Sequence, residues 1–286
     1  MSEGQKQFPR TVVGGVSLPR MLIGTNWILG YSHTGHAADQ MIAARNRDID
    51  AICGILEAYL DYGINAIMGP LCISPGLIDA IRRTEQKRGQ EIILIDTPTL
   101  NVNDSAEARA EARRLVKQSA GLGSKFCLPH HTCVEQLVDK NKEEIRRISD
   151  YLSMIRDAGM IPGFSAHMPE VILYSDKNGY DAETYIQIFN CAGFMMQIEI
   201  ETVSRIIHEA KKPVMTIKPM AAGRLTPYVG ITFNFAALRG VDMVTLGAFT
   251  PDEVHEDVEI AFAALEHRFP ELERRSSPAA SQTLLK

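Results

Sequence analysis

The sequence lacks the features of several protein classes. No apolar run approaches the roughly eighteen residues that a membrane-spanning helix needs, and residues 1–10 are polar where an export signal would be apolar. No Gly-x-Gly-x-x-Gly follows a predicted strand, so a doubly wound dinucleotide-binding sheet has no support. The formal net charge of −5 attracts neither nucleic acid nor an anionic membrane. We expect a cytoplasmic protein whose partner is a small-molecule substrate.

Cysteines are few and scattered. The chain has 5, an odd number, and no two have the Cys-x-x-Cys spacing of a zinc or iron–sulfur site. We interpret them as reduced thiols, which are typical of a cytosolic protein. A sustained heptad pattern is also missing, so the sequence leaves the oligomeric state open.

The chain does contain a regular alternation of short apolar runs and amphipathic stretches. The runs are rich in β-branched residues, as expected of strands buried on both faces of a parallel sheet. Eight such runs, each followed by helical periodicity, predict an α/β fold, the (β/α)8 TIM barrel. The predicted strands are Met21–Asn26, Ile64–Met68, Glu91–Asp96, Lys125–Leu128, Ile161–Ala166, Thr184–Phe189, Val214–Ile217 and Val241–Leu246.

Two further segments frame this barrel. A hairpin over residues 10–19, turning on Gly14-Gly15, is predicted before the first strand. The barrel then forms one domain over residues 8–267, followed by a tail over residues 268–286. Among the predicted helices is one over Lys142–Ala158. The connection Trp27–Arg47 exceeds the roughly two to six residues of a barrel loop, and we expect it to be a functional loop that covers the site.

Catalytic residues in this fold come from the C-terminal ends of the strands. Asp96, His130, His131 and His167 end three successive strands, and we expect them to converge as an acid/base group. Asp96, His130 and His167 are also a candidate set of divalent-metal ligands. Two alternatives stay open: one of His130 and His131 faces outward, and Asp96 caps a turn.

Other polar residues at the same end complete the predicted site. Lys218 ends the seventh strand, where a lysine holds a substrate anion or acts as an amine nucleophile. Of these roles we favour charge stabilisation. The predicted substrate contacts are Asn26, Trp27, Tyr31, His33, His36, Asn190 and Arg224.

Four segments resemble the aldo/keto reductase superfamily, especially its bacterial branch with an iron–sulfur appendix. Residues 163–170, Gly-Phe-Ser-Ala-His-Met-Pro-Glu, are similar to the fifth-strand motif of that branch, and residues 217–225, Ile-Lys-Pro-Met-Ala-Ala-Gly-Arg-Leu, to its seventh-strand motif. Residues 189–195 and 241–257 resemble the sixth-strand and eighth-strand segments. The similarity covers residues 8–267 and implies a barrel whose bottom is plugged by the hairpin.

Most residues that the family uses for reduction are absent. Met68-Gly69-Pro70 stands where the resemblance implies Asp-Thr-Ala, and no catalytic tyrosine follows it. Asp96 replaces the family's lysine, and His130 or His131 is the histidine that remains. Ala248-Phe249-Thr250 stands where a basic residue holds the cofactor phosphate, and the iron–sulfur cysteines are missing. The fold therefore carries over more readily than the activity.

We predict an enzyme that kept the barrel and changed its chemistry, such as an isomerase, lyase or hydrolase for a small hydroxylated carbonyl or sugar-like compound. The cofactor stays open: a divalent metal is compatible with the site, and NADP(H) is less well supported. One alternative is an NADP(H)-dependent reductase with a relocated proton donor, such as Tyr31 or a histidine. The other is a non-catalytic ligand-binding barrel.

Overall fold

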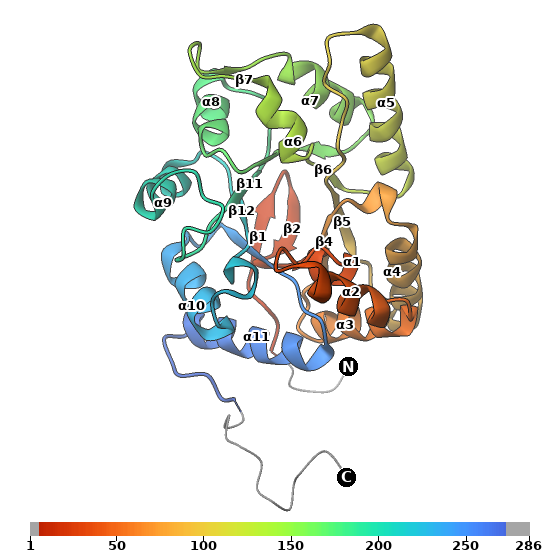
Figure 1. Cartoon of the computed structure of the whole chain (residues 1–286), viewed down its shortest axis with the longest axis vertical. Helices are drawn as coiled ribbons and strands as arrows, with labels where there is room; N and C mark the ends of the chain where they lie inside the picture. Colours follow the sequence, from red (N-terminus) through yellow and green to blue (C-terminus); the bar gives the residue numbers. More distant parts are fainter. Residues whose placement is uncertain (1–5, 273–286) are drawn as a thin grey trace, which may run out of the picture.

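Each of the eight predicted apolar runs forms a strand in the computed structural model, which describes residues 6–272 (Figure 1). Neighbouring strands are parallel and lie in the order β10-β11-β12-β13-β3-β4-β5-β6-β9. The prediction of a (β/α)8 barrel is confirmed. The strand segments are β3 (Met21–Gly24), β4 (Ala66–Gly69), β5 (Ile93–Asp96), β6 (Phe126–Cys127), β9 (Ile161–Pro162), β10 (Phe164–Ala166), β11 (Tyr185–Ile188), β12 (Val214–Ile217) and β13 (Met243–Leu246).

The ring closes at its fifth strand, which is divided at Gly163. Its first part, β9, pairs with β6, and its second part, β10, pairs with β11. A Cβ atom at Gly163 would lie 2.6 Å from the backbone oxygen of Thr184 and 3.0 Å from the side chain of Leu128. Only glycine fits this close backbone approach, so the residue lets one strand change partners.

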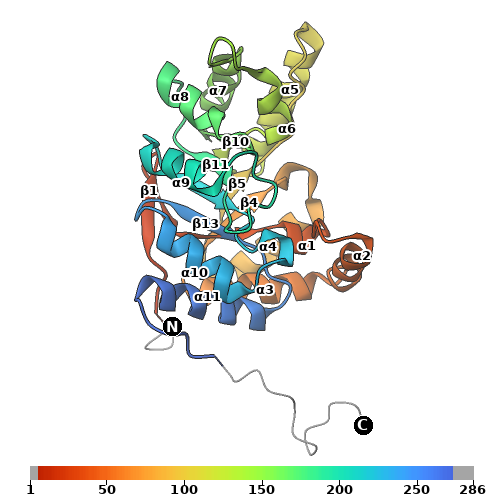
Figure 2. The same cartoon turned by 60° about the vertical axis from the view of Figure 1, so that its left-hand side comes forward.

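Helices follow the strands and surround the ring (Figures 1 and 2). Their local signals are ordinary ones: Asp48 caps α3 by accepting the N–H of Asp50, and Thr250 caps α11 by accepting the N–H of Glu253. The large helices are α3 (Ile49–Asp61), α4 (Pro75–Arg88), α5 (Ala106–Gly121), α7 (Ile148–Asp157), α8 (Glu170–Asn178), α9 (Ile200–Glu209), α10 (Pro227–Ala237) and α11 (Pro251–Leu265).

The core has an inner and an outer layer. Leu22 points into the barrel, while its neighbours Met21 and Ile23 pack against the helices. The predicted hairpin forms from β1 (Arg10–Val13) and β2 (Val16–Pro19), and its Val13 and Leu18 join the inner layer. The hairpin therefore closes the end of the barrel opposite the strand C-termini.

The connection Trp27–Arg47 differs from the expected loop. It contains two helices, α1 (Asn26–Leu29) and α2 (His36–Arg45), and α2 lies at the edge of the molecule (Figure 2). Asn46 fixes the end of α2 to the start of the connection, because its Nδ2 donates to the backbone oxygen of Ile28 at 2.9 Å. Much of this segment is therefore regular structure.

The helix predicted over Lys142–Ala158 begins only at Ile148. Glu143 and Arg147 have left-handed backbone with φ values of 53° and 56°, which a continuous helix does not allow. A small hairpin precedes the helix, made of β7 (Val138–Asp139) and β8 (Glu144–Ile145). The remaining short elements are α6 (His131–Val134), η1 (Leu71–Ile73), η2 (Glu135–Leu137) and η3 (Ala221–Gly223).

No helix within residues 6–272 is long and apolar enough to cross a membrane. Most of the tail predicted over residues 268–286 lies outside the described residues, which end at residue 272.

Candidate functional site

A pocket of about 970 Å³ lies at the C-terminal end of the barrel strands. Its wall comes from strand ends, from the first part of the connection after β3, and from the segment between β12 and α10. One end reaches the first turns of α11. This is the face on which (β/α)8 barrels carry their catalytic residues.

Three histidines form part of this wall. His130 and His131 follow β6, and His167 follows β10. The ring centroids of His130 and His131 are 4.2 Å apart, and those of His131 and His167 are 3.7 Å apart with planes inclined by 18°. Both members of the His130-His131 pair thus face the pocket, which excludes the alternative that one of them faces outward.

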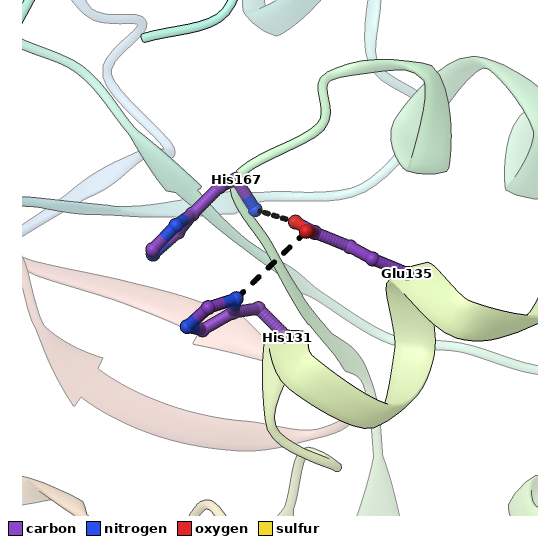
Figure 3. Close-up of side chains that lie close together, drawn as sticks. All are labelled: His131, Glu135 and His167. Carbon is purple, nitrogen blue, oxygen red and sulfur yellow. Dashed lines mark hydrogen bonds and ion pairs between the residues drawn. The ribbon is translucent and has the colours of Figure 1, made fainter. Parts of the chain in front are cut away.

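Glu135 holds this group from behind (Figure 3). Its Oε1 accepts the backbone N–H of His167 at 2.5 Å and that of Met168 at 3.0 Å, and its Oε2 lies 3.8 Å from Nδ1 of His131. Burial by itself would raise the pKa of Glu135, but these neighbours hold that pKa below its usual value. Both rings extend to the same side, away from Glu135. The position of the carboxylate therefore suits the tautomer of His131 that has its proton on Nδ1 and a lone pair on Nε2.

Two of the histidines stay neutral at pH 7. Burial lowers the pKa of His130 to about 4 and that of His167 to about 3. Besides burial, repulsion from His131 and Lys218 contributes to both low pKa values, and attraction to Glu135 opposes the decrease. A neutral ring has one N–H donor and one lone pair. In His130, Nδ1 already lies 2.9 Å from Oγ1 of Thr132, so Nε2 is the atom left for a ligand.

Asp96 does not join the histidines, which corrects the expected convergence. The carboxylate is fully buried at the end of β5. Its Oδ1 accepts the N–H groups of Leu71 at 2.7 Å and Cys72 at 3.3 Å, and its Oδ2 accepts the hydroxyl of Ser119 on α5. Asp96 thus fixes the connection after β4, and the expected metal group of Asp96, His130 and His167 is not assembled.

A different set could hold a metal ion. Within residues 6–272, the ligand atoms of His131, Glu135 and His167 lie within 4.8 Å of one another. The two rings are stacked, however, so their in-plane lone pairs run side by side, whereas a shared ion requires lone pairs that converge. One ring would have to turn before both could bind one ion. As it stands, the arrangement suits proton transfer better than coordination.

Lys218 lines the same pocket from the end of β12. Its Nζ lies 2.8 Å from Nε2 of His33, which comes from the connection after β3. Burial lowers the pKa of Lys218 to about 8. Burial also lowers the pKa of His33, and the charge of Lys218 adds to this effect. The pair therefore brings an amine and an imidazole from opposite ends of the sequence to one place.

The remaining predicted residues fall into two groups. Asn190 is fully buried; its Nδ2 donates to the backbone oxygen of Phe194 at 3.1 Å, and its Oδ1 accepts the N–H of Phe194 at 2.8 Å. It shapes the loop after β11 and does not line the pocket. His36 stands exposed on the first turn of α2, outside the pocket wall. The predicted substrate contacts that do line the pocket are Asn26, Trp27, Tyr31, His33 and Arg224.

Comparison with known proteins bears on the fold. No protein-family model matches the chain, and no curated protein matches it in sequence. A solved structure from Pseudomonas aeruginosa, named a "putative aldo-keto reductase", superposes with a TM-score of 0.65 at 16% identity over 93% of this chain and 100% of that one. The chain has an aldo/keto reductase-like barrel fold.

Two other solved structures resemble this aldo/keto reductase-like barrel less closely. The aldose reductase from Giardia lamblia gives a TM-score of 0.53 at 11% identity, covering 89% of both chains. A chain of the BexX/CysO complex from Amycolatopsis orientalis gives 0.54 at 13% identity, covering 94% of this chain and 100% of that one. At these identities the likeness shows the fold alone.

Sequence reasoning missed two residues of the aldo/keto reductase-like barrel that matter for the site. Glu135 is four residues after His131, a spacing that puts both on one face of a helix, but the segment reads as a connection. Thr245 lies one residue before the end of β13 and lines the pocket. Its side chain is 7% exposed, and its Oγ1 has no hydrogen-bond partner among the described residues. Side chains alternate between the two faces of a strand, so the sequence shows which residues face the inside of the barrel only when the register of the strand is known.

Proposed function

We propose that this barrel is an enzyme that moves protons on a small hydroxylated carbonyl compound, as isomerases and lyases do. The observation that carries the proposal is the stacked pair of His131 and His167 with Glu135 behind it. With its proton held on Nδ1, His131 can use Nε2 to remove a proton from the carbon next to a carbonyl. His131 can then return that proton to the neighbouring carbon, while the N–H of neutral His167 can donate a hydrogen bond to the oxygen.

Lys218 supports the same reaction from another strand. When a proton leaves the carbon, negative charge develops on the carbonyl oxygen, and a partly buried ammonium stabilises that charge strongly. With a pKa of about 8, Lys218 remains mostly charged at pH 7. The unpaired hydroxyl of Thr245 suits a substrate hydroxyl, since a buried polar atom without a partner costs free energy that a ligand can recover.

Hydrogen exchange tests this proposal even when the product is unidentified. The protein is incubated in D2O with small hydroxylated aldehydes and ketones, and the loss of carbon-bound proton signals is followed by NMR. We expect exchange with at least one compound, and its loss in His131→Ala and Glu135→Gln. Glu91→Gln is the matched control, because the exposed Glu91 side chain has no partner among the described residues. Equal exchange by His131→Ala and the wild type would refute the proposal.

The same assay separates metal-free from metal-dependent chemistry. We expect the exchange to survive treatment with EDTA, because the stacked rings are not arranged around an ion. Loss with EDTA and recovery with Zn²⁺ would instead support a metal held by His131, Glu135 and His167. A cytoplasmic location is part of the proposal, since all five cysteines are free thiols.

A second candidate function is NADP(H)-dependent reduction. It is favoured by the extent of the pocket, which continues from the histidines past Gly223 and Thr226 to Glu253 on α11 and so has room for a longer ligand. Tyr31 and His130 also line it and are candidate proton donors. Trp27 lies in the pocket wall, so NADPH binding should quench its fluorescence and raise the melting temperature. If NADPH changes neither signal, the reductase candidate is excluded.

A further inference from the structure

The contacts of Lys218 are unusual for a lysine. Within residues 6–272 its Nζ forms no ion pair with a carboxylate, and its polar contact is with Nε2 of His33 at 2.8 Å. A lysine ammonium has only donors, so His33 must accept here and carry its own proton on Nδ1. Asn26 agrees with this assignment, because its Nδ2 lies 3.3 Å from the same Nε2 and also has only hydrogens to offer. An unprotonated imidazole nitrogen therefore faces Nζ, ready to take a proton from it.

Backbone geometry aims this pair at the pocket. Lys218 and His33 both have left-handed backbone, with φ values of 59° and 58°, a conformation that residues other than glycine rarely adopt. Met195 and Ala222 share this conformation and also line the pocket. Strained positions of this kind collect at functional sites, where the surrounding structure holds a side chain in one working position.

Burial favours the neutral amine. With a pKa of about 8, Lys218 is about 9% unprotonated at pH 7, whereas a lysine with the ordinary value of 10.5 is about 0.03% unprotonated. The free amine, which is the nucleophilic form, is thus about 300 times more abundant here than at an exposed lysine.

We propose that Lys218 is a covalent catalyst that forms an imine with the carbonyl carbon of the substrate, and that His33 carries its protons. This inference rests on the proposed function in one respect, namely that the substrate is a carbonyl compound. It goes beyond that function because the carbonyl oxygen is expelled and is not merely stabilised by charge.

Imine formation needs the two side chains, the substrate and one proton from water. The lone pair of neutral Nζ attacks the carbonyl carbon, and the π electrons of the C=O bond move to oxygen. His33 Nε2 takes one proton from nitrogen and delivers it to that oxygen, which gives a carbinolamine. A second proton, which His33 takes up from water, lets the hydroxyl leave as water while the nitrogen lone pair forms a double bond to carbon, which gives the protonated imine. The protonated imine then accepts the electron pair when His131 removes the neighbouring proton, and hydrolysis later returns Nζ and the carbonyl.

Reductive trapping tests the imine directly. The folded protein is mixed with dilute glycolaldehyde and sodium cyanoborohydride, which reduces an imine to a stable secondary amine carrying a hydroxyethyl group. Lys212 and Lys218 each precede a proline, so trypsin spares both bonds and leaves both lysines in the peptide of residues 212–224. Fragment ions then report the two lysines side by side. Lys212 is the internal control, since it forms an ion pair with Glu183 at 3.0 Å.

We expect label on Lys218 to exceed label on Lys212 at least about tenfold at pH 7, because burial raises the free-amine fraction of Lys218 and Glu183 holds Lys212 in an ion pair. His33→Ala should slow labelling of Lys218 and leave Lys212 unchanged, and Lys218→Arg should leave only the background on Lys212. Circular dichroism confirms that each variant is folded. Equal labelling of the two lysines in the wild type would overturn the proposal.

Deuterium exchange distinguishes this result from failure of the proposed function. If Lys218 is not trapped but proton exchange persists, the lysine acts only by charge and the imine is refuted alone. If Lys218 is trapped selectively but His131→Ala exchanges like the wild type, the imine stands and the role of His131 falls.

Discussion

Removal of the Glu135 carboxylate gives a graded test of how the histidine group is held. In Glu135→Ala, the N–H groups of His167 and Met168 lose the oxygen that accepts both of them. An unsatisfied buried donor costs about 1–3 kcal/mol, so two would cost about 2–6 kcal/mol. The Glu135 side chain is 20% exposed, and water can replace part of what is lost. We therefore expect the free energy of unfolding to fall by about 2–4 kcal/mol.

Glu135→Gln separates the hydrogen bonds from the charge. Its amide oxygen can still accept both N–H groups, so we expect a loss of less than about 1 kcal/mol. Without the negative charge, however, the pKa values of His130 and His167 should fall still further, because Glu135 raises both.

Urea unfolding followed by circular dichroism measures the first effect, and NMR titration of the histidine rings measures the second. Glu91→Ala is the control and should change stability by less than about 0.5 kcal/mol, as surface substitutions usually do. The reasoning fails if Glu135→Gln destabilises the protein as much as Glu135→Ala, or if neither variant changes stability.

Three further outcomes are expected. Gly163→Ala should lower the free energy of unfolding by about 1–3 kcal/mol, because its Cβ would push the Thr184 carbonyl away. Gly76→Ala lies in open space on α4 and should raise the free energy of unfolding by up to about 1 kcal/mol. Thermal melts compare the two variants. The free energy of unfolding should fall as the pH drops below about 6.5, because unfolded histidines bind protons there, whereas folded His130 and His167 bind them only near pH 4 and 3. His167→Gln should flatten this slope, and an unchanged slope would contradict the pKa assignment. Acetylation of Lys218, followed by mass spectrometry against pH, should have its midpoint near pH 8, and a midpoint near 10.5 would show that the amine is solvated.

The strands of the barrel could be read from the sequence because each is a short apolar run whose burial on both faces leaves a clear pattern. The runs Val214–Ile217 and Ile161–Ala166 are both found as strands, the second interrupted at Gly163. The change of partner at Gly163 was not predictable. It depends on the close approach of the Thr184 backbone, which is distant in the sequence and lies near Gly163 only in the folded ring. The sequence also did not predict that α7 begins late, because nothing in the residue types of Glu143 and Arg147 indicates a left-handed backbone.

The site was only partly predictable because position at a strand end does not fix the direction of a side chain. Asp96 and His167 both stand at strand ends, yet Asp96 turns outward to buried N–H donors and His167 turns into the pocket. Polar partners decide between these directions, and those of Asp96 come from η1 and α5, which sequence reasoning could not place. Asn190 behaves in the same way, since the N–H and carbonyl of Phe194 satisfy it within its own loop.

The divided fifth strand has a consequence for how the barrel responds to a ligand. Beyond Gly163, β10 pairs with β11 and no longer with the fourth strand, β6. Within the described residues, three hydrogen bonds join β10 and the residues after it to the segment after β6: the N–H of Ser165 donates to the oxygen of Pro129, and the N–H groups of His167 and Met168 donate to Glu135. His131 lies in the segment after β6, and His167 lies directly after β10, so the two histidines stand on opposite sides of this junction. A ligand that binds both imidazoles would therefore also hold these two segments together. The backbone amides of β10 should then exchange hydrogen more slowly when the pocket is occupied. Ligand binding and closure of the ring at these edges should therefore be thermodynamically linked.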